Sequence, residues 1–277
     1  MTTVIPGDVA NLGLCALVTV ALQAGCFLVA YTCQFDLLTD LAGSMNFVLL
    51  AGLTLGLGGA TPRGIAISAL VIASRLELGG FLLFRVCSRG GDARFDAIRH
   101  SCVSFAVFWT FQAVWAFGVS LPVIYTNMVP AAASPPFGTA ADIAGCVVFG
   151  LAWATQVAAD LQKHAFRAKA ANRGRICDEG VWAVSRHPNF FGEIMMWWAA
   201  FIIASSDFAV PGWTWGWATI ISPILTFVII MLGSGMPTVR RARWPCRRRR
   251  HRWLLSARSN CHSPPSPRCA RRPRATT

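Results

Sequence analysis

The sequence predicts an all-α protein, a polytopic bundle of transmembrane helices. Its composition supports this, because 55% of the 277 residues are hydrophobic and 13% are charged, whereas about 25% of the residues in a soluble domain are charged. The sequence also contains seven apolar runs near the length of about 20 residues that a helix needs to cross a membrane. Open sheets cannot span lipid, and such long continuous runs exclude a barrel.

We expect seven spans, within a range of six to eight. The first run is too long for the core of a signal peptide and follows no Lys or Arg, so we interpret it as a retained helix. The second run is rich in Gly and the sixth is short, and these two runs are the reason for a range in the number of spans. The runs are Val9–Tyr31, Leu41–Gly59, Ile65–Leu83, Ser101–Tyr125, Ala140–Ala159, Ile194–Val210 and Trp213–Leu232.

Basic residues in the loops predict the orientation. Segments 84–100 and 160–190 together contain ten Lys and Arg residues, whereas the loops of the opposite side contain only Arg63. Basic residues are enriched in cytosolic loops. We therefore expect the N-terminus outside the cytosol or in a lumen, and the C-terminus in the cytosol.

The net charge of +13 belongs to the C-terminal tail. All twelve acids and an equal number of bases precede residue 234, and the thirteen bases that follow are all Arg. A nucleic-acid partner is therefore not indicated. We expect a membrane-embedded domain of residues 1–237 and an Arg/Pro-rich tail of residues 238–277. The tail is either a disordered segment attracted to anionic lipid or a frameshifted reading of the gene.

Ionisable residues within or beside the runs are candidates for function, because a charge at membrane depth is costly. Glu77 follows Arg75 by two residues, and it either forms a local ion pair with this residue or donates a proton to a substrate. Asp40 is either a helix cap or a second candidate proton donor. Gln112 should hydrogen-bond to another helix or a ligand, since an unpaired buried amide is unfavourable.

The densest polar segment extends from Asp160 to Glu193. If the helix of the fifth run continues, Asp160, Lys163, His164 and Arg167 share one face. Two fixed cations and an imidazole on this face match a pyrophosphate or a 2′-phosphate, since Arg binds such oxygens in a bidentate fork. No metal is expected, because the histidines lack paired carboxylate or Cys partners and the ten Cys contain no CxxC pair.

His187-Pro188 should end any preceding helix, and Asn189 could cap the sixth span. Basic flanking residues plus a helix cap would also explain this segment from spacing alone.

Ser185-Arg-His-Pro-Asn-Phe-Phe-Gly-Glu193, followed by Trp197-Trp198, resembles the signature of a membrane family related to steroid 5-alpha-reductases. Asp160-x-Gln162-Lys163 with Phe166 resembles it too, and the likeness covers roughly residues 30–237. The branch is uncharacterised and is similar to the C-terminal region of 3-oxo-5-alpha-steroid 4-dehydrogenases. A similar Arg-His-Pro turn occurs in isoprenylcysteine carboxyl methyltransferases.

The resemblance implies an NADPH-dependent oxidoreductase that reduces a carbon–carbon double bond of a sterol, enone or related lipid, in the endoplasmic reticulum if the source is eukaryotic. The alternatives are an S-adenosylmethionine-dependent methyltransferase of a lipid or isoprenylcysteine substrate, and an inactive membrane remnant. The cofactor-site residues that the resemblance implies are Asp160, Gln162, Lys163, Arg167, Arg186, His187, Asn189 and Glu193.

Two departures from the family pattern bear on activity. Gln156 occupies a place where the family usually has an acid, and an amide cannot act as a general acid. After Pro237 the family usually continues to a Tyr-containing end that closes over the cofactor, whereas this chain has no Tyr beyond Tyr125.

Overall fold

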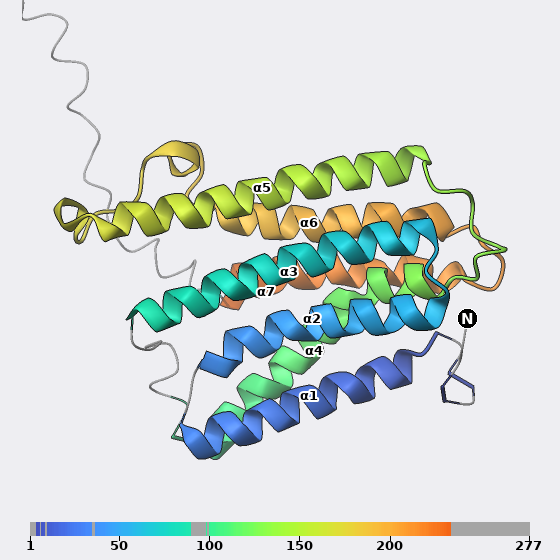
Figure 1. The fold of residues 1–277 in the computed structure, drawn as a ribbon, viewed down its shortest axis with the longest axis horizontal. Helices are drawn as coiled ribbons and strands as arrows, with labels where there is room; N and C mark the ends of the chain where they lie inside the picture. The colour runs from blue at the N-terminus through green and yellow to red at the C-terminus, as the bar shows by residue number, and fades with distance from the viewer. Residues whose placement is uncertain are drawn as a thin grey trace, which may run out of the picture. The chain divides into compact units, whose positions relative to one another are not determined.

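The computed structural model describes residues 4–5, 7–8, 10–34, 37–89, 98 and 100–233 (Figure 1). Within these residues the protein is all helical, without strands, so the predicted fold class is confirmed. The predicted tail of residues 238–277 lies outside the described residues. The α-helices are α1 (Leu12–Cys33), α2 (Leu37–Gly58), α3 (Pro62–Arg89), α4 (Cys102–Met128), α5 (Ala140–Ala168), α6 (Pro188–Ala204) and α7 (Ile221–Gly233).

Six helical segments of the described chain are long and apolar enough to cross a membrane, and the protein is a multi-pass membrane protein. The six segments include each of α1 to α5, and the last, Thr214–Leu232, joins the 3-10 helix η4 (Thr214–Ile220) to α7. α6 has 17 residues. It begins before the predicted span of Ile194–Val210, with Pro188 in the first helical turn, where a missing N–H costs nothing. The orientation of the bundle in the membrane stays a prediction.

α3 and α5 end, and α6 begins, at the same end of the bundle (Figure 1). The described basic residues there include Arg85 of α3 and those of the segment 160–190. We call this the charged end. α3 has 28 residues and α5 has 29, which makes them about 42 and 44 Å long at 1.5 Å per residue. Because a hydrocarbon core is about 30 Å thick, parts of both helices extend beyond it.

α5 and α6 lie side by side in Figure 1 and pack closely through glycines. A Cβ added at Gly192 of α6 would lie 2.7 Å from the backbone oxygen of Ala152 in α5. A Cβ at Gly145 of α5 would lie 2.5 Å from Ile203 Cγ1 and 3.0 Å from the Ala199 oxygen. Small residues let helix backbones approach in a membrane, where van der Waals packing drives helix association.

Gly192→Ala should therefore lower the free energy of unfolding by about 1–3 kcal/mol, the usual cost of overpacking. Thermal unfolding of the purified protein in detergent measures this. Gly150→Ala in α5 is the matched control, since its added Cβ would have no neighbour within 4 Å. The control should be neutral or slightly stabilising, because Ala favours helices over Gly by about 1 kcal/mol. Equal effects of the two substitutions would contradict the close-packing account.

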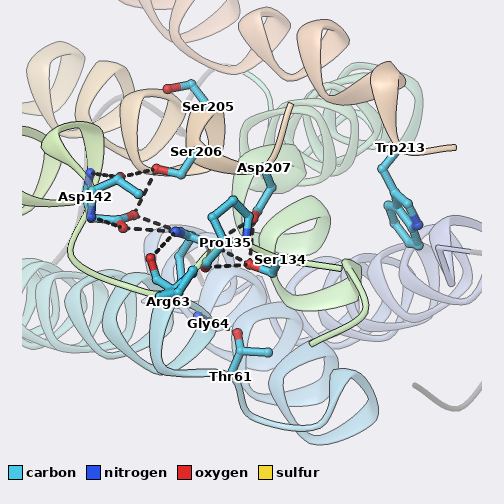
Figure 2. Close-up of polar contacts among 12 residues, drawn as sticks. Thr61, Arg63, Gly64, Ser134, Pro135, Asp142, Ser205, Ser206, Asp207 and Trp213 are labelled. Carbon is cyan, nitrogen blue, oxygen red and sulfur yellow. Dashed lines mark hydrogen bonds and ion pairs between the residues drawn. The ribbon is translucent and has the colours of Figure 1, made fainter. Parts of the chain in front are cut away.

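At the end of the bundle opposite the charged end, a buried ionic cluster joins the start of α3 to two connections between helices (Figure 2). Arg63, which is 1% exposed, donates from Nε to Asp142 Oδ1 at 2.8 Å and from Nη2 to Asp142 Oδ2 at 3.0 Å. It also donates from Nη1 to Asp207 Oδ1 at 2.7 Å, and Ser134 Oγ donates to the same oxygen at 2.7 Å. We call these four residues the Arg63 cluster.

The local sequence positions the Asp142 carboxylate to bind Arg63. Thr139 and Asp142 form a capping box at the start of α5, in which each side chain accepts from the other residue's backbone N–H. Asp142 thus caps its own helix and binds Arg63 at the start of α3. Asp207 lies in the 3-10 helix η3 (Ser205–Asp207) between α6 and α7. The cluster therefore links the start of α3 to the α4–α5 and α6–α7 connections.

The contacts of α2 and α4 test two of the sequence predictions. Gln112 of α4 donates from Nε2 to the Thr39 oxygen of α2 at 2.9 Å, which confirms the predicted bond to another helix. The cap interpretation of Asp40 was wrong, because α2 begins at Leu37 and Asp40 lies within its first turn. The Asp40 carboxylate instead pairs with Arg85 of α3 at 3.4 Å.

Candidate functional site

A cleft opens at the charged end among α3, α5 and the first turn of α6. The four residues predicted to share a helix face all line it, since α5 continues for two turns beyond the predicted end of its span at Ala159. Two residues of α3 and one of α6 complete the walls. The lining residues are Phe81, Arg85, Asp160, Lys163, His164, Arg167 and Asn189.

The cleft carries an excess of positive charge. Its fixed cations are Arg85, Lys163 and Arg167, and Asp160 is the single carboxylate among its lining residues. The ring of His164 lies near Phe81 and Phe84, with centroid distances of 6.2 and 5.4 Å. Guanidinium and ammonium groups that converge on one cleft favour an anionic group such as a phosphate.

Asn189 contributes a polar group to the same cleft. The predicted capping role of Asn189 was wrong, because His187 occupies the N-cap position of α6 and makes no side-chain capping bond. Asn189 Nδ2 instead donates to Asp160 Oδ1 at 3.5 Å. Asn189 Oδ1 is buried without a hydrogen-bond partner among the described residues. A buried acceptor without a partner is unfavourable.

The loop of residues 169–187, which we call the α5–α6 loop, holds Lys163 in place. Lys163 Nζ lies 4.5 Å from the centroid of the Trp182 ring, a cation–π contact. Trp182 Nε1 donates to the Ala159 oxygen at 2.8 Å, which fastens the indole to α5. Gln162 Oε1 accepts from the Val181 N–H at 2.9 Å, so this amide anchors the loop. Gly180 has a positive φ of 57°, which a residue without a side chain adopts without strain.

His187 and Arg186 lie beside the cleft, outside its lining residues. The His187 ring stacks on Phe190 with a centroid distance of 5.1 Å and an interplanar angle of 4°. Burial lowers the pKa of His187 below its ordinary value, and the positive charges of Lys163 and Arg186 act in the same direction. His187 is therefore mostly neutral at pH 7 and can offer both a donor and an acceptor. Arg186 is exposed.

Glu193 lies deeper, in a buried ion pair with Arg75 of α3. Arg75 donates from Nη1 to Glu193 Oε1 at 2.8 Å and from Nη2 to Oε2 at 3.0 Å. Trp197 Nε1 and Gln156 Nε2 donate to the same carboxylate at 2.8 and 3.1 Å. The guanidinium also lies over the ring of Phe47 at 5.8 Å from its centroid. These contacts stabilise the two opposite charges inside the helical bundle.

The predicted local pair of Arg75 with Glu77 was therefore wrong. Glu77 accepts from Trp153 Nε1 at 3.3 Å and lies one helical turn before Phe81 of the cleft. Gln156, which stands where the resembling family has an acid, supplies an N–H to Glu193. An acid there would place a second carboxylate beside Glu193.

Half of the eight predicted cofactor residues line the cleft: Asp160, Lys163, Arg167 and Asn189. Gln162, Arg186, His187 and Glu193 lie elsewhere, as described above. Arg85 was missed as a site residue, although its position four residues after Phe81 would place it on the same face of a continued helix. In the part of the chain that the structure describes, no three His, Cys, Asp or Glu residues form a group that could hold a metal ion.

Comparison with known proteins gives one match. A family model described as a protein of unknown function, DUF1295, matches residues 26–253. No curated protein and no solved structure matches the chain.

Proposed function

The chain belongs to the DUF1295 family, a membrane-associated family related to steroid 5-alpha-reductase-like proteins, and from this premise we propose that it is an NADPH-dependent membrane oxidoreductase. Its reaction is the reduction of a carbon–carbon double bond in a sterol, enone or related lipid. If the source is eukaryotic, we place it in the endoplasmic reticulum.

The observation that carries this proposal is the cationic cleft. Arg85, Lys163 and Arg167 supply the charges that a 2′-phosphate or pyrophosphate requires. Asn189 adds a polar side chain to the lining of the same cleft. The residues present therefore fit the phosphate-bearing part of NADPH.

The position of the cleft suits a water-soluble cofactor and a membrane-dissolved substrate. Ala140–Ala159 of α5 spans about 30 Å, the thickness of a hydrocarbon core. The segment from Asp160 to Arg167 then lies just beyond the edge of the hydrocarbon core, where a dinucleotide can reach it from water. NADPH supplies the hydride when bound. The protein's part is to hold the phosphates, orient the cofactor and exclude water.

Asp40 and Glu77 remain our candidate proton donors for this reaction. Asp40 pairs with Arg85, a residue of the cleft, and Glu77 lies one turn deeper on α3 than Phe81. Both residues thus lie close to lining residues of the cleft. A donor in this position could protonate a lipid substrate as it receives the hydride.

S-Adenosylmethionine is the competing cofactor. It carries a sulfonium cation and no phosphate, so a cleft with surplus positive charge favours NADPH over it. The charge balance of the cleft is the reason we prefer the reductase.

NADPH should stabilise the purified full-length protein in detergent against thermal unfolding. At a concentration of 100 times its Kd, a ligand of the native state adds about 2.7 kcal/mol of stability. Lys163→Ala and Arg167→Ala should each weaken NADPH binding by about tenfold or more, since a hydrogen bond to a charged group contributes about 1.5–3 kcal/mol. The measurement is the shift in unfolding temperature over a titration of NADPH.

Arg173→Ala is the matched control, because Arg173 is exposed on the α5–α6 loop and does not line the cleft. Its NADPH titration should match that of the wild type. A stabilisation by S-adenosylmethionine alone would replace the reductase with the methyltransferase. If neither cofactor shifts the unfolding temperature, the chain is a membrane remnant without cofactor chemistry.

A further inference from the structure

The α5–α6 loop exposes two large apolar side chains. Ile176 is 66% exposed and Val184 is 93% exposed. Their neighbours Cys177 and Trp182 are buried against α5, in a small apolar cluster with Ala159 and Phe166. The loop therefore has an inner apolar face that fixes it to α5 and separate apolar residues that point away from the protein.

The contacts of the loop fix it to α5 near Ala159 and Gln162. Trp182 Nε1 donates to the oxygen of Ala159, and Val181 N–H donates to Gln162 Oε1. Ala159 is the twentieth residue of α5, about 30 Å along the helix from its start, which equals the thickness of the core. Val184 lies two residues after Trp182 in the sequence. With the hydrocarbon core taken to begin at the start of α5, we infer that the loop lies at the depth of the lipid headgroups.

The loop is also basic. Its exposed bases exceed its exposed acids, which are Asp178 and Glu179. Arg175 is held to the loop through a hydrogen bond from Nη1 to Asn172 Oδ1 at 3.1 Å, so its charge has a fixed position. The exposed bases are Lys169, Arg173, Arg175 and Arg186.

We propose that the α5–α6 loop binds the anionic phospholipid headgroups of the membrane in which the protein lies. Ile176 and Val184 enter the headgroup region, and the exposed bases contact the lipid phosphates. Apolar side chains beside Lys and Arg are the composition of segments that bind at membrane interfaces. Lys169 and Arg173 do not line the cleft, so this site is separate from the cofactor site and does not depend on the proposed reaction.

Native mass spectrometry of the full-length protein tests this, with phosphatidylglycerol and phosphatidylcholine added in turn to the detergent-solubilised protein. The wild type should retain phosphatidylglycerol in preference to phosphatidylcholine. Lys169→Gln and Arg173→Gln should each weaken phosphatidylglycerol binding by about fivefold, the effect of one basic residue near an anionic surface. Phosphatidylcholine binding should not change. Val184→Ser should weaken the binding of both lipids.

Asp178→Asn is the matched control of opposite sign, and it should strengthen phosphatidylglycerol binding because it removes a negative charge from the loop. All these side chains are exposed, so the unfolding temperature without lipid should stay that of the wild type. Wild-type phosphatidylglycerol binding in Lys169→Gln and Arg173→Gln would overturn the proposal. Displacement of the lipid by millimolar inorganic phosphate would also overturn the proposal. So would an Arg173→Gln variant that binds lipid like the wild type but shows a smaller NADPH-induced shift in unfolding temperature.

Discussion

Arg63→Ala should destabilise the protein more than any surface substitution, lowering the free energy of unfolding by about 3–5 kcal/mol. The change leaves Asp142 and Asp207 buried without the guanidinium that neutralises them. It also removes the contacts that join the start of α3 to the α4–α5 and α6–α7 connections (Figure 2). Thermal or denaturant unfolding in detergent measures the loss.

Arg63→Lys should recover only part of this loss. A lysine retains the charge, but its compact ammonium cannot reproduce the bidentate bond to Asp142 together with the bond to Asp207. If Arg63→Lys were as stable as the wild type, charge alone would account for the cluster and the guanidinium geometry would not matter.

Asp207→Asn is the informative control, because two carboxylates share one guanidinium in this cluster. Burial raises the pKa of Asp207 above its ordinary value, against the opposing effects of Ser134 and Arg63. An acid whose folded-state pKa is raised contributes stability that is present below its ordinary pKa and lost as the pH rises through the raised value. The free energy of unfolding of the wild type should therefore increase as the pH falls from 7 through the raised pKa of Asp207.

Asn at position 207 retains an oxygen for Arg63 and Ser134 and removes the surplus negative charge. Asp207→Asn should thus be as stable as the wild type at pH 7 or more stable, and it should lose this pH response. Asp142→Asn should be destabilised, since Asp142 carries the bidentate bond and the helix cap. A loss in Asp207→Asn as large as that in Arg63→Ala would contradict the surplus-charge account.

Glu193→Ala should also lower the free energy of unfolding by about 3–5 kcal/mol, because it leaves the Arg75 guanidinium buried without its counter-ion. Arg75 is 2% exposed, so water does not replace the lost carboxylate. Trp197 Nε1 and Gln156 Nε2 lose their acceptor at the same time. Unfolding in detergent, with and without NADPH, separates this structural loss from a loss of cofactor binding.

The double variant Arg75→Met with Glu193→Leu is the control for this prediction. Replacing a whole buried ion pair with apolar residues of similar volume is often neutral or stabilising. The double variant should therefore recover most of the stability that Glu193→Ala loses. If Glu193→Ala instead keeps wild-type stability and abolishes the NADPH response, Glu193 belongs to the cofactor site and not to the packing of the bundle.

Much of the cleft was predictable, because four of its residues lie at three- and four-residue spacing on one helix. Asp160, Lys163, His164 and Arg167 share a face whenever the fifth span continues as a helix, which is a local property. Arg85 required the third span to continue beyond Leu83 and to pack beside α5, which spacing within one helix does not show. Asn189 was predicted only through the resemblance, since spacing within α5 does not show that the first turn of α6 lines the cleft.

The sequence by itself determined the class of the protein, the order of its helices and the end of the bundle that carries the basic loops. These follow from local properties, namely the length of an apolar run and the Lys and Arg that flank it. Only the tertiary structure decided which charges pair. Arg75 and Glu77 are two residues apart, a spacing that does not bring side chains together on a helix.

Arg75 instead pairs with Glu193, 118 residues away, and Arg63 pairs with Asp142 and Asp207, 79 and 144 residues away. A buried charge needs a partner within a few ångströms, and the packing of α3 against α5, α6 and their connecting loops determines which carboxylate lies within that distance.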